Sequence, residues 1–149
     1  CGITLRHGKS HMVLAVLEGV AYGLRDFLEL IRELGVPVQQ LRGSGGGVRS
    51  ALWRQVIADV FDTELVTVRV TEGAAYGAAL LAGVGVGVWR DVAAACACGV
   101  QVKEYVPPGP DVARYADYYQ VYRELYPALR PLFAATAQVV ACHFDSPVQ

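Results

Sequence analysis

Three consecutive glycines, Gly45, Gly46 and Gly47, stand between a short apolar stretch and an amphipathic one. Glycine adopts backbone angles closed to other residues and lets another molecule approach the main chain. The stretch that follows has the apolar spacing of a helix, whose first N–H groups and positive dipole end attract anions. The junction therefore predicts either a nucleotide site at the glycines or a tight strand-to-helix turn without a ligand.

Two common nucleotide motifs do not fit this junction. A P-loop has Gly-Lys-Ser or Gly-Lys-Thr after its glycines, and no such sequence follows here. A dinucleotide-binding fingerprint has its third glycine where Val48 stands, and an acidic residue that closes the next strand. That strand ends in Val70-Thr71-Glu72, which is a weak fit. A dinucleotide enzyme is therefore disfavoured.

Apolar periodicity predicts helices and strands in alternation along the chain. Helices are expected over residues 10–34, 50–61, 71–82 and 89–98 and from 111 onward, and strands over 38–42, 65–70 and 100–106. We expect Ser10, Thr71 and Asp111 to cap helices, with Asp91 near the start of its helix. Residues 83–88 are expected to be a flexible connection and residues 107–110 a stiff linker. Strands alternating with helices through short loops predict an α/β fold.

Two helices carry apolar stripes that predict their packing faces. On the first helix the stripe recurs at three- and four-residue steps and comprises Val13, Val16, Leu17, Val20, Leu24, Phe27, Leu28, Ile31 and Leu34. On the last helix it comprises Val112, Tyr115, Tyr119, Tyr122 and Tyr126, and we interpret it as a packing seam. Pro127 and Pro131 are expected to break that helix into turns, and residues 141–149 are expected to fray. Gln55 and Asp59 are expected to form a solvated polar face.

Composition limits the possible partners. Hydrophobic residues make up 54% of the 149 residues and charged residues only 18%, so another part of the protein is expected to cover some surface. A net charge of −1 indicates neither nucleic acid nor anionic membrane as a partner, and no apolar run is long enough to span a bilayer. Cys96 and Cys98 lack metal-site spacing, and His7 and His11 lack a third ligand. Free cysteines fit a reducing cytoplasm.

Four stretches, in order, resemble the FGGY family of carbohydrate kinases, and most closely its xylulose kinase branch. They are Gly2-Ile3 with His11-Met12 and residues 15–18, residues 44–50 with Trp53, Gln55, Ala58 and Asp59, residues 72–82, and residues 122–129. The resemblance covers nearly the whole chain. It implies that residues 1–149 are the C-terminal, nucleotide-binding domain of a two-domain sugar kinase with an actin-like, ribonuclease-H-like ATPase fold. The N-terminal sugar-binding domain would be absent from this chain.

The resemblance also implies roles for particular residues. Gly46, Gly47 and Ser50 would line the adenine of ATP, and Gly45 would shape the loop. Residues 72–82 would close the back of the adenine pocket, and Asp59 would tie its helix to a neighbouring loop. The catalytic base and the phosphate loops would lie upstream, so no catalytic residue and no metal ligand is expected here. Mg²⁺ would be held by phosphates and by the missing domain.

The activity implied by the resemblance is transfer of the γ-phosphate of ATP to a sugar hydroxyl, first of all from D-xylulose to D-xylulose 5-phosphate. Glycerol, gluconate and ribulose are the alternative substrates, and a non-catalytic interaction domain is the alternative of another class. This chain alone is expected to be inactive. Its expected partners are the N-terminal domain, ATP and the sugar, and a chain separated from that domain can form a homodimer through exposed apolar surface.

Overall fold

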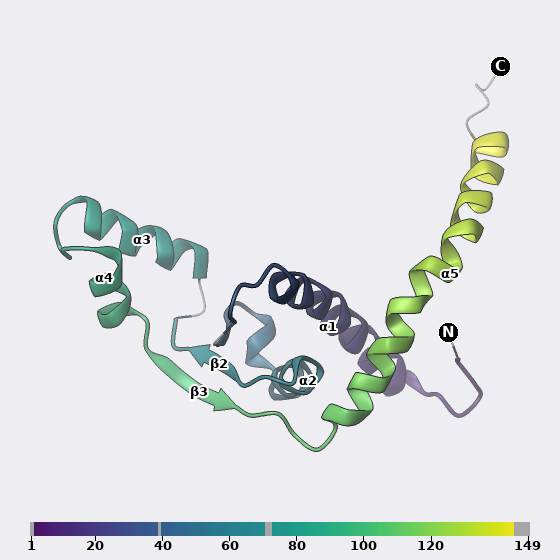
Figure 1. Ribbon diagram of the computed structural model, residues 1–149, viewed down its shortest axis with the longest axis horizontal. Coiled ribbons are helices and arrows are strands. Elements are labelled where there is room, and N and C mark those ends of the chain that lie inside the picture. The colour runs from purple at the N-terminus through teal and green to yellow at the C-terminus, as the bar shows by residue number, and fades with distance from the viewer. Residues whose placement is uncertain (1, 39, 71–72, 145–149) are drawn as a thin grey trace.

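The computed structural model describes residues 2–38, 40–70 and 73–144 (Figure 1). In chain order its elements are α1 (Lys9–Glu33), β1 (Leu41–Gly43), the 3-10 turn η1 (Gly47–Arg49), α2 (Ala51–Phe61), β2 (Leu65–Val68), α3 (Gly73–Gly85), α4 (Val92–Gly99), β3 (Val102–Val106) and α5 (Val112–Phe144). The predicted α/β class is confirmed. No helix in these described ranges is both long and apolar enough to cross a membrane.

The sheet has β2 at its centre, with β1 parallel on one side and β3 antiparallel on the other. Leu41 pairs with Leu65, and Val66 pairs with Tyr105. Because β1 and β2 run in the same direction, α2 returns the chain between them as the helix of a βαβ unit. This connection places residues 43–50, which we call the glycine segment, at the carboxyl end of β1.

The core lies between α2 and its neighbours. Ala58 on α2 packs against Leu65 and Val106 of the sheet. The opposite side of α2 forms a second cluster with α1 and α5, made of Ala21, Tyr22, Leu28, Val56, Val60, Phe61, Tyr115 and Tyr119. The pair α3 and α4 packs together at one end of the molecule (Figure 1). The glycine segment therefore precedes the best-buried helix of the fold.

The first helix begins at Lys9 with Gly8 at its N-cap, so the predicted cap at Ser10 is wrong. The earlier start follows from His11, whose Nδ1 accepts a hydrogen bond from the Gly8 N–H at 3.1 Å. The end agrees with the prediction: Gly35 has a φ of 75°, and Val36 donates to the Ile31 carbonyl. This arrangement is a Schellman motif. His7 is a loop residue whose Nδ1 accepts from the Thr4 N–H at 2.9 Å.

The buried face of α1 differs from the predicted one. Ala21, Tyr22 and Leu28 are buried, whereas Val16 and Phe27 are each 66% exposed. The cause is that α1 is apolar around much of its circumference, and α2 and α5 contact only one side of it. The predicted stripe therefore faces outward over most of its length, among the residues that the structure describes.

The tyrosine seam on α5 is confirmed for its first part. Tyr115 and Tyr119 are buried against Tyr22, with ring centroids 6.3 and 6.0 Å from the Tyr22 ring. Tyr126 is 66% exposed and lies outside the seam. The seam thus ends where α5 leaves the body of the molecule (Figure 1).

The last helix continues through Pro127 and Pro131 to Phe144, so the predicted break at the prolines is wrong. Each proline removes one N–H from the helix ladder. The carbonyls that lose a partner are those of Arg123 and Pro127, and both residues are exposed, so water can satisfy them. The expected fraying at residues 141–144 is also wrong, and residues 145–149 lie outside the described part of the chain.

The segment after α3 is an ordered helix end, which corrects the expected flexible connection at residues 83–88. Gly87 has a φ of 79°, and Val88 donates to the Gly83 carbonyl at 2.8 Å. Trp89 packs on Gly83 so closely that a Cβ there would lie 2.1 Å from the ring. Asp91 then caps α4 by accepting from the Ala94 N–H at 2.7 Å. The predicted cap at Thr71 lies outside the described residues.

Candidate functional site

The glycine segment folds as one compact turn between β1 and α2. Gly45 has a φ of 87°, a conformation that favours glycine. Gly46 is the N-cap of η1, and its carbonyl accepts from the Arg49 N–H at 3.2 Å. The Gly47 carbonyl accepts from the Ser50 N–H at 3.1 Å. The four predicted site residues, Gly45, Gly46, Gly47 and Ser50, therefore all belong to this turn.

The three glycines have different surroundings. A Cβ on Gly45 or Gly46 would meet no atom within 4 Å, so both positions face open space. A Cβ on Gly47 would lie 3.0 Å from Nε1 of Trp53, the half-buried indole of α2. Gly47 therefore lets the turn rest on Trp53, while Gly45 and Gly46 leave its outer surface free of side chains.

Ser50 is the N-cap of α2. Its Oγ accepts from the Trp53 N–H at 3.3 Å, which satisfies one of the free N–H groups of the first turn. A hydroxyl that accepts in this way keeps its own proton for another acceptor. Ser50 is exposed, so that proton points to a surface that a ligand can reach.

A cavity of about 260 Å³ adjoins the turn, between the carboxyl ends of β1 and β2 and the helices α3 and α4. It is lined by Arg42, Gly43, Ser44, Val68, Val70, Gly73, Tyr76, Gly77, Leu80, Cys96, Gly99, Val100 and Gln101. The glycine segment contributes Gly43 and Ser44 to this wall, whereas the four predicted site residues follow Ser44 in the chain and are not among the lining residues described. Tyr76 and Leu80 of α3 line this cavity, and the closing of an adenine pocket by residues 72–82 stays a prediction.

The cavity wall is held together by close contacts between elements. The Tyr76 hydroxyl donates to the Gly99 carbonyl at 3.0 Å and so joins α3 to the end of α4. A Cβ on Gly73 would lie 2.9 Å from the Ser44 Oγ, so α3 begins directly beside the glycine segment. Among the lining residues that the structure describes, Arg42 is the one that carries a charge. An apolar wall with few polar groups is typical of small-molecule sites.

Local sequence patterns did not identify Ser44, Tyr76 or Gln101 as site residues. Tyr76 bonds to the carbonyl of Gly99, which lies 23 residues later in the sequence. Gln101 follows α4 in the chain. The one available signal was the small-residue character of α3, which allows its close approach to the glycine segment.

The helix behind the turn is anchored by Asp59. Its Oδ1 accepts from the Gly109 N–H at 2.6 Å and from the Gln55 amide at 2.8 Å. Asp59 is only 4% exposed, so the expected solvated face at Gln55 and Asp59 is wrong. The polar groups are instead used to hold residues 107–110 on α2, which agrees with the loop-tying role expected for Asp59.

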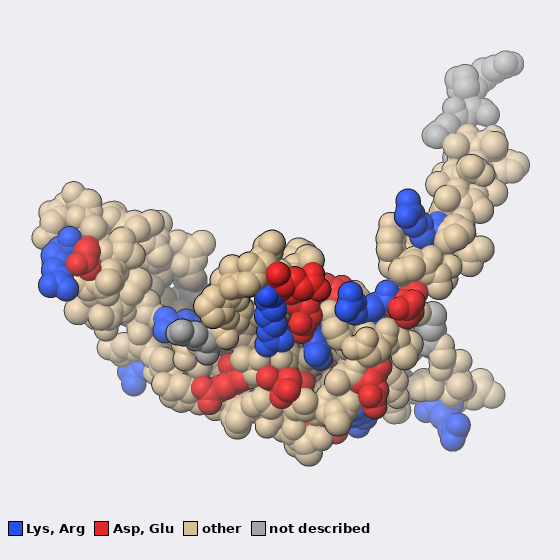
Figure 2. All heavy atoms as spheres, in the orientation of Figure 1, with Lys and Arg blue, Asp and Glu red and all other residues tan. Residues whose placement is uncertain are grey.

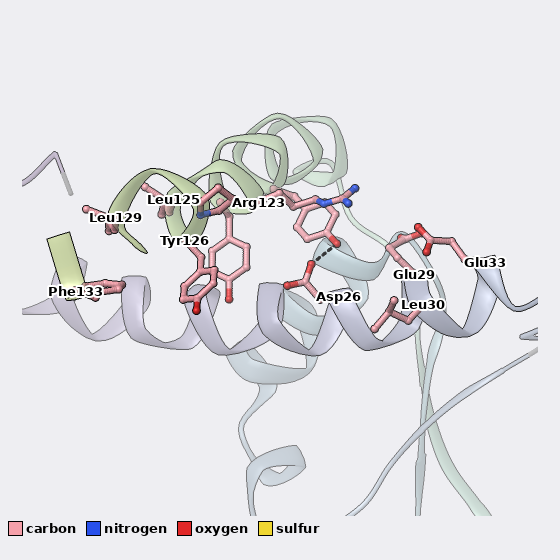
Figure 3. Close-up of a pocket in the computed structure, with 12 residues that line it drawn as sticks. Asp26, Glu29, Leu30, Glu33, Arg123, Leu125, Tyr126, Leu129 and Phe133 are labelled. Carbon is pink, nitrogen blue, oxygen red and sulfur yellow. Dashed lines mark hydrogen bonds between the residues drawn. The ribbon is translucent and has the colours of Figure 1, made fainter. Parts of the chain in front are cut away.

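A larger cavity of about 700 Å³ lies between α1 and α5, remote from the glycine segment in the chain (Figure 3). Asp26 and Glu29 line it from α1, and Tyr126 and Phe133 line it from α5. Two of its three acidic groups are already engaged: Asp26 accepts from Tyr119, and Glu29 pairs with Arg25 and Arg32. This cavity is the space left where α5 diverges from α1.

The charged side chains do not mark either cavity as a metal centre. Figure 2 shows acidic and basic groups interspersed over the middle of the molecule, while the far part of α5 carries none. In the described ranges no three His, Cys, Asp or Glu residues come close enough to hold a metal ion. The donors present therefore do not fit a magnesium site made by this chain alone.

Known proteins share the α/β fold that positions this turn and cavity. Residues 1–86 match the family model described as "FGGY family of carbohydrate kinases, C-terminal domain". The chain belongs to this family.

Particular relatives agree with this assignment. A xylulose kinase of Staphylococcus epidermidis is 31% identical over 134 residues, which are 89% of this chain and 27% of the relative. A glycerol kinase of Saccharolobus islandicus is 33% identical over 118 residues, 78% of this chain and 24% of the relative. The crystal structure of a xylulose kinase from Rhodospirillum rubrum superposes with a TM-score of 0.78 at 30% identity, over 90% of this chain and 28% of that one. The chain thus spans about a quarter of the length of these relatives.

Proposed function

We propose that this chain is the ATP-binding part of a carbohydrate kinase that transfers the γ-phosphate of ATP to a sugar hydroxyl. The observation that carries the proposal is the cavity beside the glycine turn, in a chain of the FGGY family. The open space beside Gly45 and Gly46, the hydroxyl proton of Ser50 and the apolar wall suit a planar base better than a charged ligand.

In this proposal adenine lies against Gly46, Gly47 and Ser50, with Gly45 shaping the turn. The Ser50 hydroxyl donates to a ring nitrogen of the base while it accepts from Trp53. The neighbouring cavity, with Tyr76 and Gly77 at its back, holds the rest of the nucleoside. The volume of about 260 Å³ is below the ~300 Å³ typical of complete drug-sized sites, so the phosphates extend outside it.

The chemistry assigned to this chain is positioning. Phosphoryl transfer depends mainly on alignment of the reactants and on stabilisation of charge. The sugar oxygen bonds to the γ-phosphorus, the bond to the β–γ bridging oxygen breaks, and ADP leaves. The sugar proton passes to a base outside this chain. Mg²⁺, held by the phosphates and by residues elsewhere in the protein, would neutralise phosphate charge.

The proposed partner is the remainder of a longer protein. The outward apolar side of α1, with Val16 and Phe27 each 66% exposed, is unusual for a free surface. The chain spans about a quarter of its relatives' length. We therefore assign this side of α1 to contact with the preceding part of the same polypeptide. In this proposal that part would also bind the sugar. Self-association through α1 is the competing outcome.

D-Xylulose is the proposed sugar, with D-xylulose 5-phosphate as product. Support comes from the xylulose kinase relative, which aligns with 89% of this chain, against 78% for the glycerol kinase. Glycerol, gluconate and ribulose are the alternatives, because the sugar contacts lie outside this chain in the proposal.

The test is ADP release by the full-length gene product with a panel of these four substrates, with and without Gly46→Asp. The new side chain would occupy the space proposed for adenine, and we expect the KM for ATP to rise about tenfold, since overpacking of a close contact costs about 1 to 3 kcal/mol and about 1.4 kcal/mol is a factor of ten. Gly8→Asp is the matched control, because Gly8 is an N-cap facing open space and Asp is favoured there.

An unchanged KM for ATP in the Gly46→Asp variant would remove the glycine turn from the nucleotide site. Release of ADP with glycerol or gluconate alone would correct the substrate and keep the mechanism. A folded protein that releases no ADP with any sugar would favour the non-catalytic interaction domain.

A further inference from the structure

The carbonyl groups of Val48 and Arg49 are left without backbone donors where η1 meets α2. The N–H groups that follow them belong to the first turn of α2, and no backbone hydrogen bond to either carbonyl is found among the described residues of this junction. One side chain fills this gap: Nη1 of Arg54 donates to the Val48 carbonyl at 2.7 Å and to the Arg49 carbonyl at 3.2 Å. Arg54 thus binds the back of the turn whose front carries Gly45 and Gly46.

Arg54 is itself oriented by a residue from another part of the fold. Its Nη2 lies 3.2 Å from Oε2 and 3.4 Å from Oε1 of Glu104 on β3. The Arg54 side chain is only 15% exposed, and its own helix position is fixed by the bond from its N–H to the Ser50 carbonyl at 3.1 Å. One guanidinium therefore joins the turn, α2 and the sheet.

We propose that Arg54, oriented by Glu104, is a positioning residue for the nucleotide site. It sets the direction in which Gly46, Gly47 and Ser50 face, without touching the ligand. This inference rests on the proposed function. Its physical basis is that charge-assisted hydrogen bonds with a fixed planar donor hold backbone more firmly than neutral ones.

The chain offers a matched control at the opposite end of α2. Nη1 of Arg25 donates to the Val60 carbonyl at 2.6 Å, and its Nε lies 3.3 Å from Oε1 of Glu29. The Arg25 side chain is also 15% exposed. Arg25→Met therefore removes the same type of contact, with the same type of acidic partner, far from the glycine turn.

The experiment uses the full 149-residue chain with Trp89→Phe, which leaves Trp53 as its sole tryptophan. Trp53 reports on the turn, because its indole lies directly under Gly47. Arg54→Met, Arg54→Lys, Glu104→Gln and Arg25→Met are compared by ADP titration, Trp53 emission and thermal unfolding. ADP is the probe, since it carries the base and ribose of the proposed ligand.

We expect Arg54→Met to weaken ADP binding about tenfold and to shift the Trp53 emission. The free energy of one hydrogen bond to a charged group corresponds to roughly a tenfold change in affinity. Arg54→Lys recovers part of the affinity, because an ammonium can still donate to the carbonyls. Glu104→Gln gives an intermediate effect. Arg25→Met lowers the Tm but changes the affinity by less than about twofold.

Equal losses of affinity in Arg54→Met and Arg25→Met would show a general effect of stability and overturn the inference. Unchanged affinity and emission in Arg54→Met would overturn it as well. An unmodified chain that does not bind ADP would contradict the proposed function together with the nucleotide role of Arg54. In that case the Trp53 emission of Arg54→Met still shows whether Arg54 holds the turn.

Discussion

The hydroxyl of Tyr119 on α5 donates to Oδ1 of Asp26 on α1 at 2.6 Å, which joins two helices through residues that lie 93 positions apart in the sequence. Tyr119 is 2% exposed, and the guanidinium of Arg25 lies 4.4 Å from the centre of its ring. The contact therefore combines a short charge-assisted hydrogen bond, apolar burial and a cation–π interaction at one point.

Tyr119→Phe tests this contact with minimal change in shape. Loss of the hydroxyl should lower the free energy of unfolding by about 1.5 to 3 kcal/mol, the range for hydrogen bonds to charged groups. Urea unfolding measures the change. Tyr118→Phe is the control, since Tyr118 is 60% exposed on the same helix, and an equal loss there would contradict the assignment.

Stability should fall as the pH rises from about 10 to about 12. Burial, followed by the hydrogen bond to Asp26, raises the pKa of Tyr119 to about 12. Burial, followed by the hydrogen bond to Glu18, raises the pKa of Tyr115 to about 12. The folded state then holds protons that the unfolded state has lost, so the stabilisation is complete below pH 10 and is lost as the pH approaches 12.

Urea unfolding at intervals from pH 9 to pH 12 measures this dependence. Tyr119→Phe should make the decline shallower, because one of the raised phenols is removed. A decline as steep as in the unmodified chain would assign the effect to other groups.

Asp59→Ala should destabilise the fold by about 2 to 3 kcal/mol, because removal of the carboxylate leaves buried donors without partners. The donors are the Gly109 N–H and the Gln55 amide. Faster hydrogen exchange of the Gly109 amide should accompany the loss. Asp62→Asn is the control: Asp62 is exposed with a φ of 47°, and asparagine tolerates that conformation. Slow exchange of the Gly109 amide in Asp59→Ala would contradict the anchoring role.

Gly47→Ala should destabilise the glycine turn by about 1 kcal/mol, the low end of the cost of overpacking. The new Cβ would lie 3.0 Å from Nε1 and 3.2 Å from Cδ1 of Trp53, so the indole must move. Thermal unfolding and Trp53 emission measure both effects. Gly46→Ala is the matched control, because Gly46 has helical backbone angles and open space around its Cα. Similar changes in both variants would show that Trp53 does not support the turn.

Sequence patterns predicted the α/β alternation and the helix that follows the glycines. Asp91 was placed at the start of its helix for a local reason, since a cap and the N–H group that donates to it lie within three residues. The buried side of α1 was wrong because apolar residues occupy more than one side of that helix. The side that is covered also carries charged groups whose bonds to other helices, such as that between Asp26 and Tyr119, no local pattern reveals. Pro127 and Pro131 were misread because an exposed helix keeps solvent partners for the carbonyls that proline leaves free.

The site was predictable only where its residues are contiguous. Gly45, Gly46, Gly47 and Ser50 stand in one run, and their part in binding stays a prediction. Arg54 and Glu104 are 50 residues apart, and no local pattern links them. Contacts of this kind arise from the register of β3 on β2, which a single sequence does not specify.

Because α5 is continuous, most of its length extends beyond the part that packs on the body of the molecule. At about 1.5 Å per residue its 33 residues extend for about 50 Å, and only the seam near its start is clamped to the body (Figure 1). Beyond Tyr122, about 22 residues project for about 33 Å. A tilt of about 10° at the seam moves the far end by about 6 Å at this length. Small changes in the packing of Tyr119 on α1 are thereby converted into displacements the size of a side chain.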